Sequence, residues 1–223
     1  MSDLKYILFD CMETIIDMDP LPKQEDYAGW GYVDSGYEKR FGSFNYFYGA
    51  YRQSKEKFAE QLKEYEEYDS LNSYLYAVGK CLPCLDVLET EKIAGEMYRN
   101  FWKKYSSFCY ISSKKKELIR RLSDRYTLGI ISNFKVPDGI EELLERCEVK
   151  QYFTHVTTSI LSGYRKPHHK IYEDALKATG LPIEQILYIG DDEICDYQGA
   201  REFGFDAYLY NEESIKMLED LLK

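Results

Sequence analysis

Five short runs of apolar or β-branched residues constrain the fold of this chain more than any other feature. They lie at residues 5–9, 127–131, 154–159, 186–189 and 206–210. Because most of these runs lack an alternation of apolar and polar residues, we expect strands that are buried on both faces, as in a parallel sheet. Helical patterns separate the later runs, at residues 113–123, 140–147, 170–178, 196–203 and 213–222. This alternation of strands and helices predicts an α/β fold with a doubly wound, mainly parallel sheet.

A long segment, residues 15–105, does not follow this alternation. It shows helical periodicity at 51–68 and 90–105, and it contains 12 of the 22 tyrosines of the chain. We therefore expect a helical insertion at 15–105 within an α/β core formed by 1–14 and 106–223, both of ordinary domain size. The tyrosines are explained either by half-buried packing in a small helical unit or by an aromatic surface that anchors a partner or a ring-bearing substrate.

The charge of the chain restricts its partners and its compartment. With 29 Lys and Arg against 39 Asp and Glu, the net charge is −10, which argues against binding to nucleic acid or to an anionic membrane.

No apolar stretch approaches the roughly 18 residues of a membrane span, and the first residues do not resemble a signal peptide. The six scattered cysteines favour reduced thiols and a cytoplasmic protein. The charge run Glu64–Asp69 is typical of a solvated helix face. The sequence does not indicate the oligomeric state.

Polar residues stand at the ends of three of the predicted strands. Asp10, Ser132 and Asp191 each follow an apolar run, and Lys166 lies in the remaining connection. Since ligands bind beyond the carboxyl ends of parallel strands, we expect these side chains to converge. Two carboxylates in one crevice repel each other unless a cation or a proton intervenes, and a hard divalent ion with oxygen ligands meets that need. Ser132 and Lys166 would then hold an anion beside the metal.

Four short motifs give the chain a resemblance to a known family. They are Phe-Asp-Cys-Met-Glu-Thr at residues 9–14, Ile-Ser-Asn at 131–133, Gly-Tyr-Arg-Lys-Pro at 163–167 and Gly-Asp-Asp-Glu-Ile-Cys-Asp at 190–196. In this order, they resemble the motifs of the haloacid dehalogenase superfamily. The insertion at 15–105 lies where that superfamily has a helical cap domain. The resemblance implies a Rossmann-like α/β core with such a cap.

The resemblance also implies roles for the motif residues. Asp10 would be the nucleophile that forms an aspartyl-phosphate, and Thr14 would orient that carboxylate or order the turn, although it could equally be a helix N-cap. Ser132 and Asn133 would bind the transferring phosphoryl group. Lys166 would neutralise both the phosphoryl group and the nucleophile.

A metal site follows from the same resemblance. Mg²⁺ would be held by Asp10, Asp191 and the backbone carbonyl of Met12, with Asp196 orienting the metal shell. The function implied is a Mg²⁺-dependent phosphatase that acts on a small phosphorylated metabolite.

One position departs from the phosphatase motif, because Met12 stands where the superfamily's phosphatases have a second aspartate. That aspartate protonates the leaving group and activates the water, and its loss costs ~10²–10⁴-fold in rate, so we expect a slow phosphatase. Glu13 could substitute, but a side chain one residue further on points elsewhere in regular backbone.

Three alternatives to a phosphatase arise from Met12. A dehalogenase would use Arg40 to bind halide, although the acidic Asp191 counts against this because dehalogenases need no metal. A phosphonate hydrolase would use a lysine of the cap as a Schiff base, and the sequence offers Lys39, Lys55, Lys57 and Lys63. The third alternative is a non-catalytic family member that binds a ligand or a partner.

Overall fold

The structure is a computed structural model that describes residues 3–223, and it divides the chain into two compact units. The α/β unit comprises Met1–Met18, Tyr65–Glu67 and Tyr110–Lys223, and the helical unit comprises Asp19–Glu64 and Tyr68–Cys109. The helical unit thus starts and ends four residues later than the 15–105 insertion expected from the sequence. A short piece of that insertion, Tyr65–Glu67, belongs to the α/β unit.

A parallel sheet of five strands forms the centre of the α/β unit within residues 3–223. Its strands are β1 (Tyr6–Phe9), β4 (Thr127–Ser132), β5 (Phe153–Thr158), β6 (Ile186–Gly190) and β7 (Asp206–Leu209). Their order is β5-β4-β1-β6-β7, and every neighbouring pair is parallel. All five overlap the apolar runs of the sequence, so the predicted doubly wound α/β fold is confirmed.

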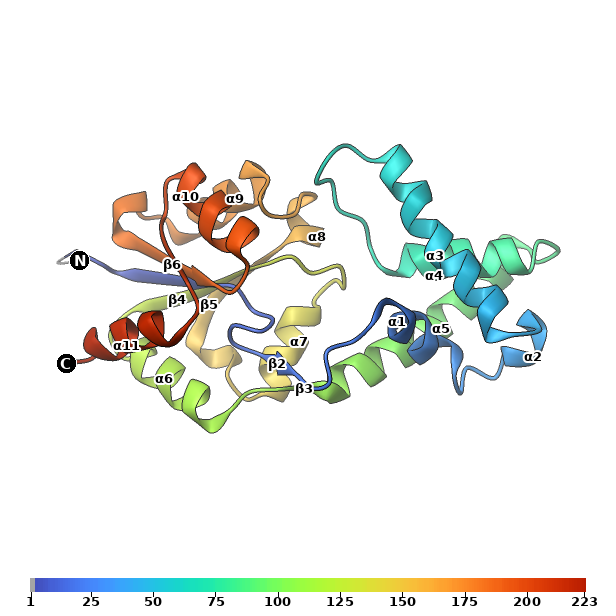
Figure 1. The fold of residues 1–223 in the computed structure, drawn as a ribbon, viewed down its shortest axis with the longest axis horizontal. Coiled ribbons are helices and arrows are strands. Elements are labelled where there is room, and N and C mark those ends of the chain that lie inside the picture. The colour runs from blue at the N-terminus through green and yellow to red at the C-terminus, as the bar shows by residue number, and fades with distance from the viewer. Residues whose placement is uncertain (1–2) are drawn as a thin grey trace. The chain divides into compact units, whose positions relative to one another are not determined.

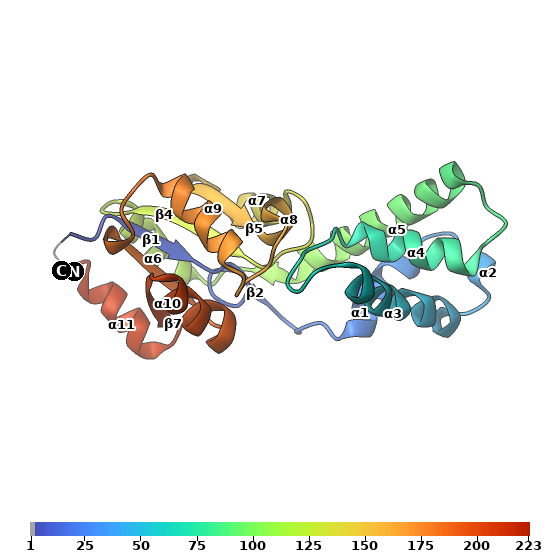
Figure 2. The same ribbon diagram turned by 90° about the horizontal axis from the view of Figure 1, so that it is seen from above.

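Helices cover both faces of this sheet. Figures 1 and 2 show α6 and α7 on one face and α9 and α10 on the other. The helical elements of this unit are α6 (Ser113–Ser123), α7 (Gly139–Arg146), α8 (Ser159–Ser162), α9 (His169–Thr179), a π-helix (Glu193–Gln198), α10 (Gly199–Phe203), α11 (Glu212–Asp220) and two 3₁₀ turns (Lys150–Tyr152, Ile183–Gln185). Ile171, Tyr172 and Ala175 of α9 pack against alternate strand residues such as Leu8 and Tyr188, which forms the apolar core on that face.

The helical unit contains more helices than the sequence pattern indicated. They are α1 (Gln24–Tyr32), α2 (Glu38–Phe41), α3 (Phe44–Gln61), α4 (Leu71–Cys81) and α5 (Val87–Phe108). Near the boundary of the two units, β2 (Asp17–Met18) pairs with β3 (Cys109–Tyr110). The helix predicted at 51–68 begins earlier, because Ser43 caps α3 by accepting a hydrogen bond from the Tyr46 amide. No helix within the described residues is long and apolar enough to cross a membrane.

Tyrosine rings fill the interior of the helical unit. Tyr74 is fully buried, and its ring centre lies 5.1 Å from that of Tyr51 and 6.0 Å from that of Phe101. Its hydroxyl donates a hydrogen bond to the carbonyl of Tyr27. Tyr32, Tyr51 and Tyr105 are buried as well. The packing interpretation of the tyrosine excess therefore holds for these residues.

The predicted solvated helix at the charge run Glu64–Asp69 is wrong. α3 ends at Gln61, α4 begins at Leu71, and the run between them is not helical. Glu67 is 8% exposed because its segment pairs with the chain around Tyr164 in the α/β unit.

Candidate active site

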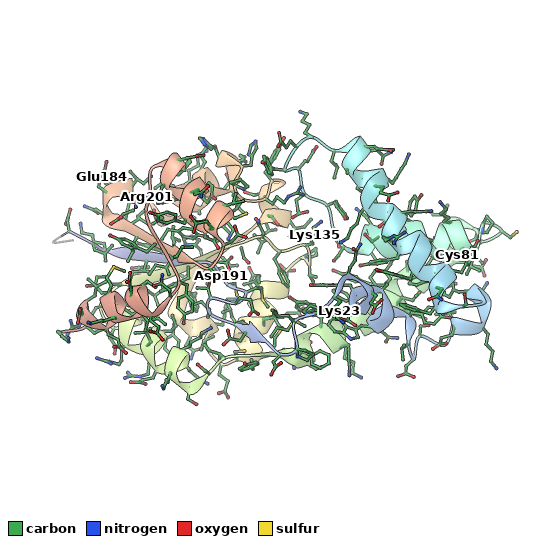
Figure 3. The ribbon with its side chains drawn as sticks, viewed as in Figure 1. Lys23, Cys81, Lys135, Glu184, Asp191 and Arg201 are labelled. Atoms are coloured by element: carbon green, nitrogen blue, oxygen red, sulfur yellow. The ribbon has the colours of Figure 1, made fainter. Side chains whose placement is uncertain are left out.

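The three residues expected at strand ends lie at the carboxyl edge of the sheet. Asp10 follows β1 and Ser132 is the last residue of β4. Asp191, which Figure 3 labels, follows β6. Because β1 lies between β4 and β6, these strand ends are neighbours, at the point where the strand order reverses. Asp10 and Ser132 are buried, whereas Asp191 is exposed.

The ammonium group of Lys166 is the centre of a buried polar network. Its Nζ lies 2.7 Å from Oδ1 of Asp10 and 2.5 Å from Oδ1 of Asp196. It also lies 3.0 Å from the hydroxyl of Tyr188 and 3.1 Å from the carbonyl of Ile131. The side chain of Lys166 is only 2% exposed, so these contacts replace its hydration.

The charges of this network shift one another's pKa values. Burial raises the pKa of Asp10 to about 7, although the ammonium of Lys166 acts in the opposite direction. Burial alone would lower the pKa of Lys166, but the carboxylates of Asp10 and Asp196 raise it above its usual range. Lys166 is therefore a permanent cation, while Asp10 lacks full charge compensation when no further cation is bound.

The acidic side chains of the site have the donor chemistry of a divalent cation site. One carboxylate oxygen from each of Asp10, Asp191 and Asp196 lies within 4.8 Å of the others. Three carboxylates against the single ammonium of Lys166 leave two negative charges, which equals the charge of one divalent cation. Hard divalent cations prefer such oxygen ligands, so the residues present fit a metal ion of this kind.

The first motif differs in detail from the expected arrangement. Thr14 donates a hydrogen bond to Oδ1 of Asp191 over 3.2 Å, so it links the first and fourth motifs. No helix begins at Thr14, which rules out the N-cap interpretation. Glu13 has a positive φ of 61°, and its Oε1 accepts a hydrogen bond from the amide of Met18 over 3.1 Å. The half-buried Met12 forms an isolated bridge with Ile16.

Asn133 connects the second and third motifs through the main chain. Its Nδ2 donates to the carbonyl of Lys166 over 3.1 Å, and its Oδ1 accepts from the amide of Lys166 over 2.6 Å. Both polar atoms of this amide therefore contact the backbone that carries the lysine. Asn133 was expected to bind phosphate, and that role stays a prediction.

Sequence reasoning assigned no role to two residues that shape this network. Tyr188 is fully buried, and its hydroxyl donates to Oδ1 of Asp196 over 2.6 Å. Gly190 allows Asp196 to approach the strand, since a Cβ at residue 190 would lie 2.6 Å from Cβ of Asp196. The alternation of strand side chains was the available signal for Tyr188, because it stands two residues before Gly190.

The residues weighed for alternative chemistry lie in the helical unit. Arg40 is exposed on α2, and Lys39, Lys55, Lys57 and Lys63 are exposed as well. They stay candidates on sequence grounds alone.

Comparisons with known proteins agree with this fold. A family model described as haloacid dehalogenase-like hydrolase matches residues 43–209. A 2-haloacid dehalogenase from Pseudomonas syringae pv. Tomato DC3000 has a similar structure, with a TM-score of 0.70 and 16% identity over 91% of this chain and 84% of that one. At this identity, the similarity establishes the fold alone.

Two curated relatives are similar in sequence. A glyceraldehyde 3-phosphate phosphatase from Pyrococcus furiosus is 28% identical over 205 residues, which cover 92% of this chain and 79% of the relative. The haloacid dehalogenase-like hydrolase domain-containing protein 3 of Xenopus laevis is 29% identical over 58% of this chain, and the match spans about half of that relative (52%). Because the family model covers most of the chain, this protein belongs to the haloacid dehalogenase-like hydrolases.

Proposed function

We propose that this hydrolase is a Mg²⁺-dependent phosphatase that acts on a small phosphorylated metabolite through an aspartyl-phosphate at Asp10. The observation that carries the proposal is the buried contact of the Lys166 ammonium with both Asp10 and Asp196, next to the exposed carboxylate of Asp191. The Pyrococcus furiosus relative, which is named as a glyceraldehyde 3-phosphate phosphatase, supports a small phosphoester as the substrate.

In the first step, an oxygen of Asp10 attacks phosphorus, and the bond from phosphorus to the leaving oxygen breaks with its electron pair. Lys166 neutralises charge on the nucleophile and on the phosphoryl oxygens, and Ser132 offers them its hydroxyl. The leaving oxygen takes a proton from solvent, because Met12 has none to give. Water then attacks phosphorus, loses a proton to solvent, and releases inorganic phosphate while the carboxylate is restored.

The metal requirement follows from the charges of the site. Mg²⁺ would be held by Asp10, Asp191 and the carbonyl of Met12, with Asp196 orienting its shell, and would supply electrostatic stabilisation of the transferring phosphoryl group. The methionine side chain does not interfere with this, since a backbone carbonyl is the ligand at residue 12. What the methionine removes is the proton donor, so turnover should be slow and should favour leaving groups that are already acidic.

A substrate panel with a nucleophile control tests the proposal. The panel contains glyceraldehyde 3-phosphate, phosphoesters of increasing leaving-group acidity, a carbonyl phosphonate and a 2-haloacid, each with Mg²⁺ and with EDTA. We expect phosphate release from the phosphoesters that needs Mg²⁺ and disappears in Asp10→Asn. Phosphate release that persists in Asp10→Asn would refute the nucleophile assignment.

A second outcome of the same panel separates the alternatives that Met12 raises. Cleavage of only the phosphonate or only the haloacid would replace the proposed reaction by hydrolysis of a carbon–phosphorus or carbon–halogen bond. If no substrate of the panel is hydrolysed and no Mg²⁺ affinity is measurable, a non-catalytic protein that binds a ligand or a partner would be favoured.

A further inference from the structure

The most unusual buried charge outside the described site is the carboxylate of Glu67. It comes from the segment between α3 and α4, yet its side chain is only 1% exposed within the α/β unit. A buried carboxylate is costly unless it is paired and hydrogen-bonded. Its contacts therefore show what this segment does in the fold.

One carboxylate oxygen of Glu67 holds the loop that follows β4. Oε2 accepts a hydrogen bond from Oγ of Ser159 over 2.9 Å, and the same Oγ accepts one from the amide of Phe134 over 2.9 Å. The second oxygen, Oε1, lies 3.2 Å from Nζ of Lys135. Phe134 and Lys135 directly follow Ser132 and its neighbour in the chain, so both contacts fix the loop that begins at the proposed phosphate-binding serine.

The main chain of the same segment holds the loop that leads to Lys166. The amide of Glu67 donates to the carbonyl of Gly163 over 2.8 Å, and the amide of Arg165 donates to the carbonyl of Tyr65 over 2.9 Å. The segment 65–67 is thus an antiparallel partner of 163–165. The next residue in the chain is Lys166.

We infer that Glu67 is a positioning residue that fixes the loop after Ser132 and the loop before Lys166 relative to each other. It does not contact the reacting atoms itself. It contacts both loops at once, through its carboxylate on one side and its backbone on the other. This inference rests on the proposed function, since Ser132 and Lys166 are the residues proposed to hold the phosphoryl group.

Glutamate suits this position because its partners need a charged acceptor. The Ser159 hydroxyl and the Lys135 ammonium both donate, and hydrogen bonds to a charged group are stronger than neutral ones. In Glu67→Gln, the amide nitrogen can only donate, so one of the two donors loses its acceptor. Loss of a hydrogen bond to a charged group costs about 1.5–3 kcal/mol, which corresponds to roughly 10–150-fold in an equilibrium constant.

The test compares Glu67→Gln with Glu64→Gln, an exposed glutamate of the same charge run that loses the same charge. Amide hydrogen exchange reports on the loops without any need for activity. We expect amide exchange at 133–135 and 163–166 to become at least about tenfold faster in Glu67→Gln, and not in Glu64→Gln. Exchange that matches the control in both loops would overturn the inference.

Kinetics give a second readout that general destabilisation would not produce. We expect Glu67→Gln to raise KM for a phosphoester by about tenfold or more while kcat changes much less, because misplaced loops weaken phosphate binding. An unchanged KM would contradict a positioning role. A wild-type protein that releases no phosphate would refute the proposed function, whereas the exchange comparison would still support or overturn the inference by itself.

A variant of the bridging serine, Ser159, tests the same inference if the Glu67→Gln protein does not fold. Ser159→Ala keeps the charge of Glu67 but removes the hydroxyl between Glu67 and Phe134. We expect faster exchange at 133–135 but unchanged exchange at 163–165, because in this variant Glu67 keeps its charge, its contact with Lys135 and the backbone hydrogen bonds of its segment to 163–165. Equal effects on both segments, or none on the first, would contradict the assigned connections.

Discussion

Replacement of Lys166 by methionine tests the electrostatic organisation of the site. The substitution keeps a long apolar stem but removes the ammonium that contacts Asp10 at 2.7 Å and Asp196 at 2.5 Å. Both carboxylates stay buried, with side-chain exposures of 8% and 2%. Removal of one partner of a buried ion pair costs about 3–5 kcal/mol, which is a large part of the 5–15 kcal/mol of typical domain stability. We therefore expect a strongly destabilised and inactive protein.

Lys170→Met is the matched control for this substitution. Lys170 pairs with Asp174 one helical turn along α9, and its side chain is 42% exposed. Such a surface pair contributes only about 0.3–0.5 kcal/mol. The measurement is the free energy of unfolding in urea, followed by circular dichroism in EDTA at neutral pH.

A double variant separates the charge effect from lost packing. If the cost of Lys166→Met comes from uncompensated carboxylates, Asp10→Asn should recover part of it, with a coupling of about 1 kcal/mol or more. Mg²⁺ should also recover part of the stability, since a cation can replace some of the missing positive charge. A Lys166→Met protein as stable as the Lys170→Met protein, or strictly additive effects of the two substitutions, would refute this reasoning.

Three further predictions test separate parts of the molecule. Gly31→Ala should destabilise the protein by about 1–3 kcal/mol, because the new methyl group would lie 2.6 Å from the hydroxyl of the buried Tyr74. Gly29→Ala on the same helix should be neutral or stabilising, since its nearest neighbour would be 3.7 Å away; equal urea midpoints for both variants would contradict this. Asp10 has a folded-state pKa raised to about 7, so in EDTA its contribution to stability is complete below pH 3.8 and is lost as the pH rises through 7. The difference in unfolding free energy between wild type and Asp10→Asn should therefore fall as the pH rises from 3.8 to about 7, and less so with Mg²⁺; a rise over this range would contradict the argument. Met12→Asp should increase phosphatase kcat by ~10²–10⁴-fold, and an unchanged or lower rate in a phosphate-release assay would show that residue 12 does not limit turnover.

The sheet could be predicted from the sequence because its signals are local. Runs such as Thr127–Ser132 are largely apolar, and a polar residue ends or directly follows β1, β4 and β6. Parallel strands bring such ends to one edge, so the proximity of Asp10 and Asp191 follows from topology. The contacts that support the site residues were harder to predict from the sequence. The approach of Asn133 to the main chain of Lys166 depends on loop conformations that no periodic pattern describes.

The helical unit was harder to predict because its stabilising contacts are distant in sequence. α1 has no clear apolar stripe, and it is buried where Gly31 lets the ring of Tyr74 approach, more than forty residues away. The prediction of a solvated helix at Glu64–Asp69 was wrong for the same reason. The polar composition of this run is typical of a solvated helix, and only the partner segment at 163–165, about a hundred residues further on, explains the burial.

The departure at Met12 changes one step of the proposed reaction and leaves the charge network intact. The contacts that hold Asp10 come from Lys166, and the remaining acidic oxygens come from the fourth motif, so none of them needs a carboxylate at residue 12. One carboxylate oxygen of Glu13 accepts a hydrogen bond from the amide of Met18, and the expectation that Glu13 does not replace the missing acid stays a prediction. In the proposed reaction, the nucleophile, the cation site and the phosphate-binding lysine thus stand together, while the leaving group lacks a proton donor at residue 12. The fold alone does not require a buried lysine between two buried aspartates, since apolar residues of similar volume at such positions are often as stable or more so. The buried charges of Lys166, Asp10 and Asp196 are therefore consistent with the proposed slow enzyme.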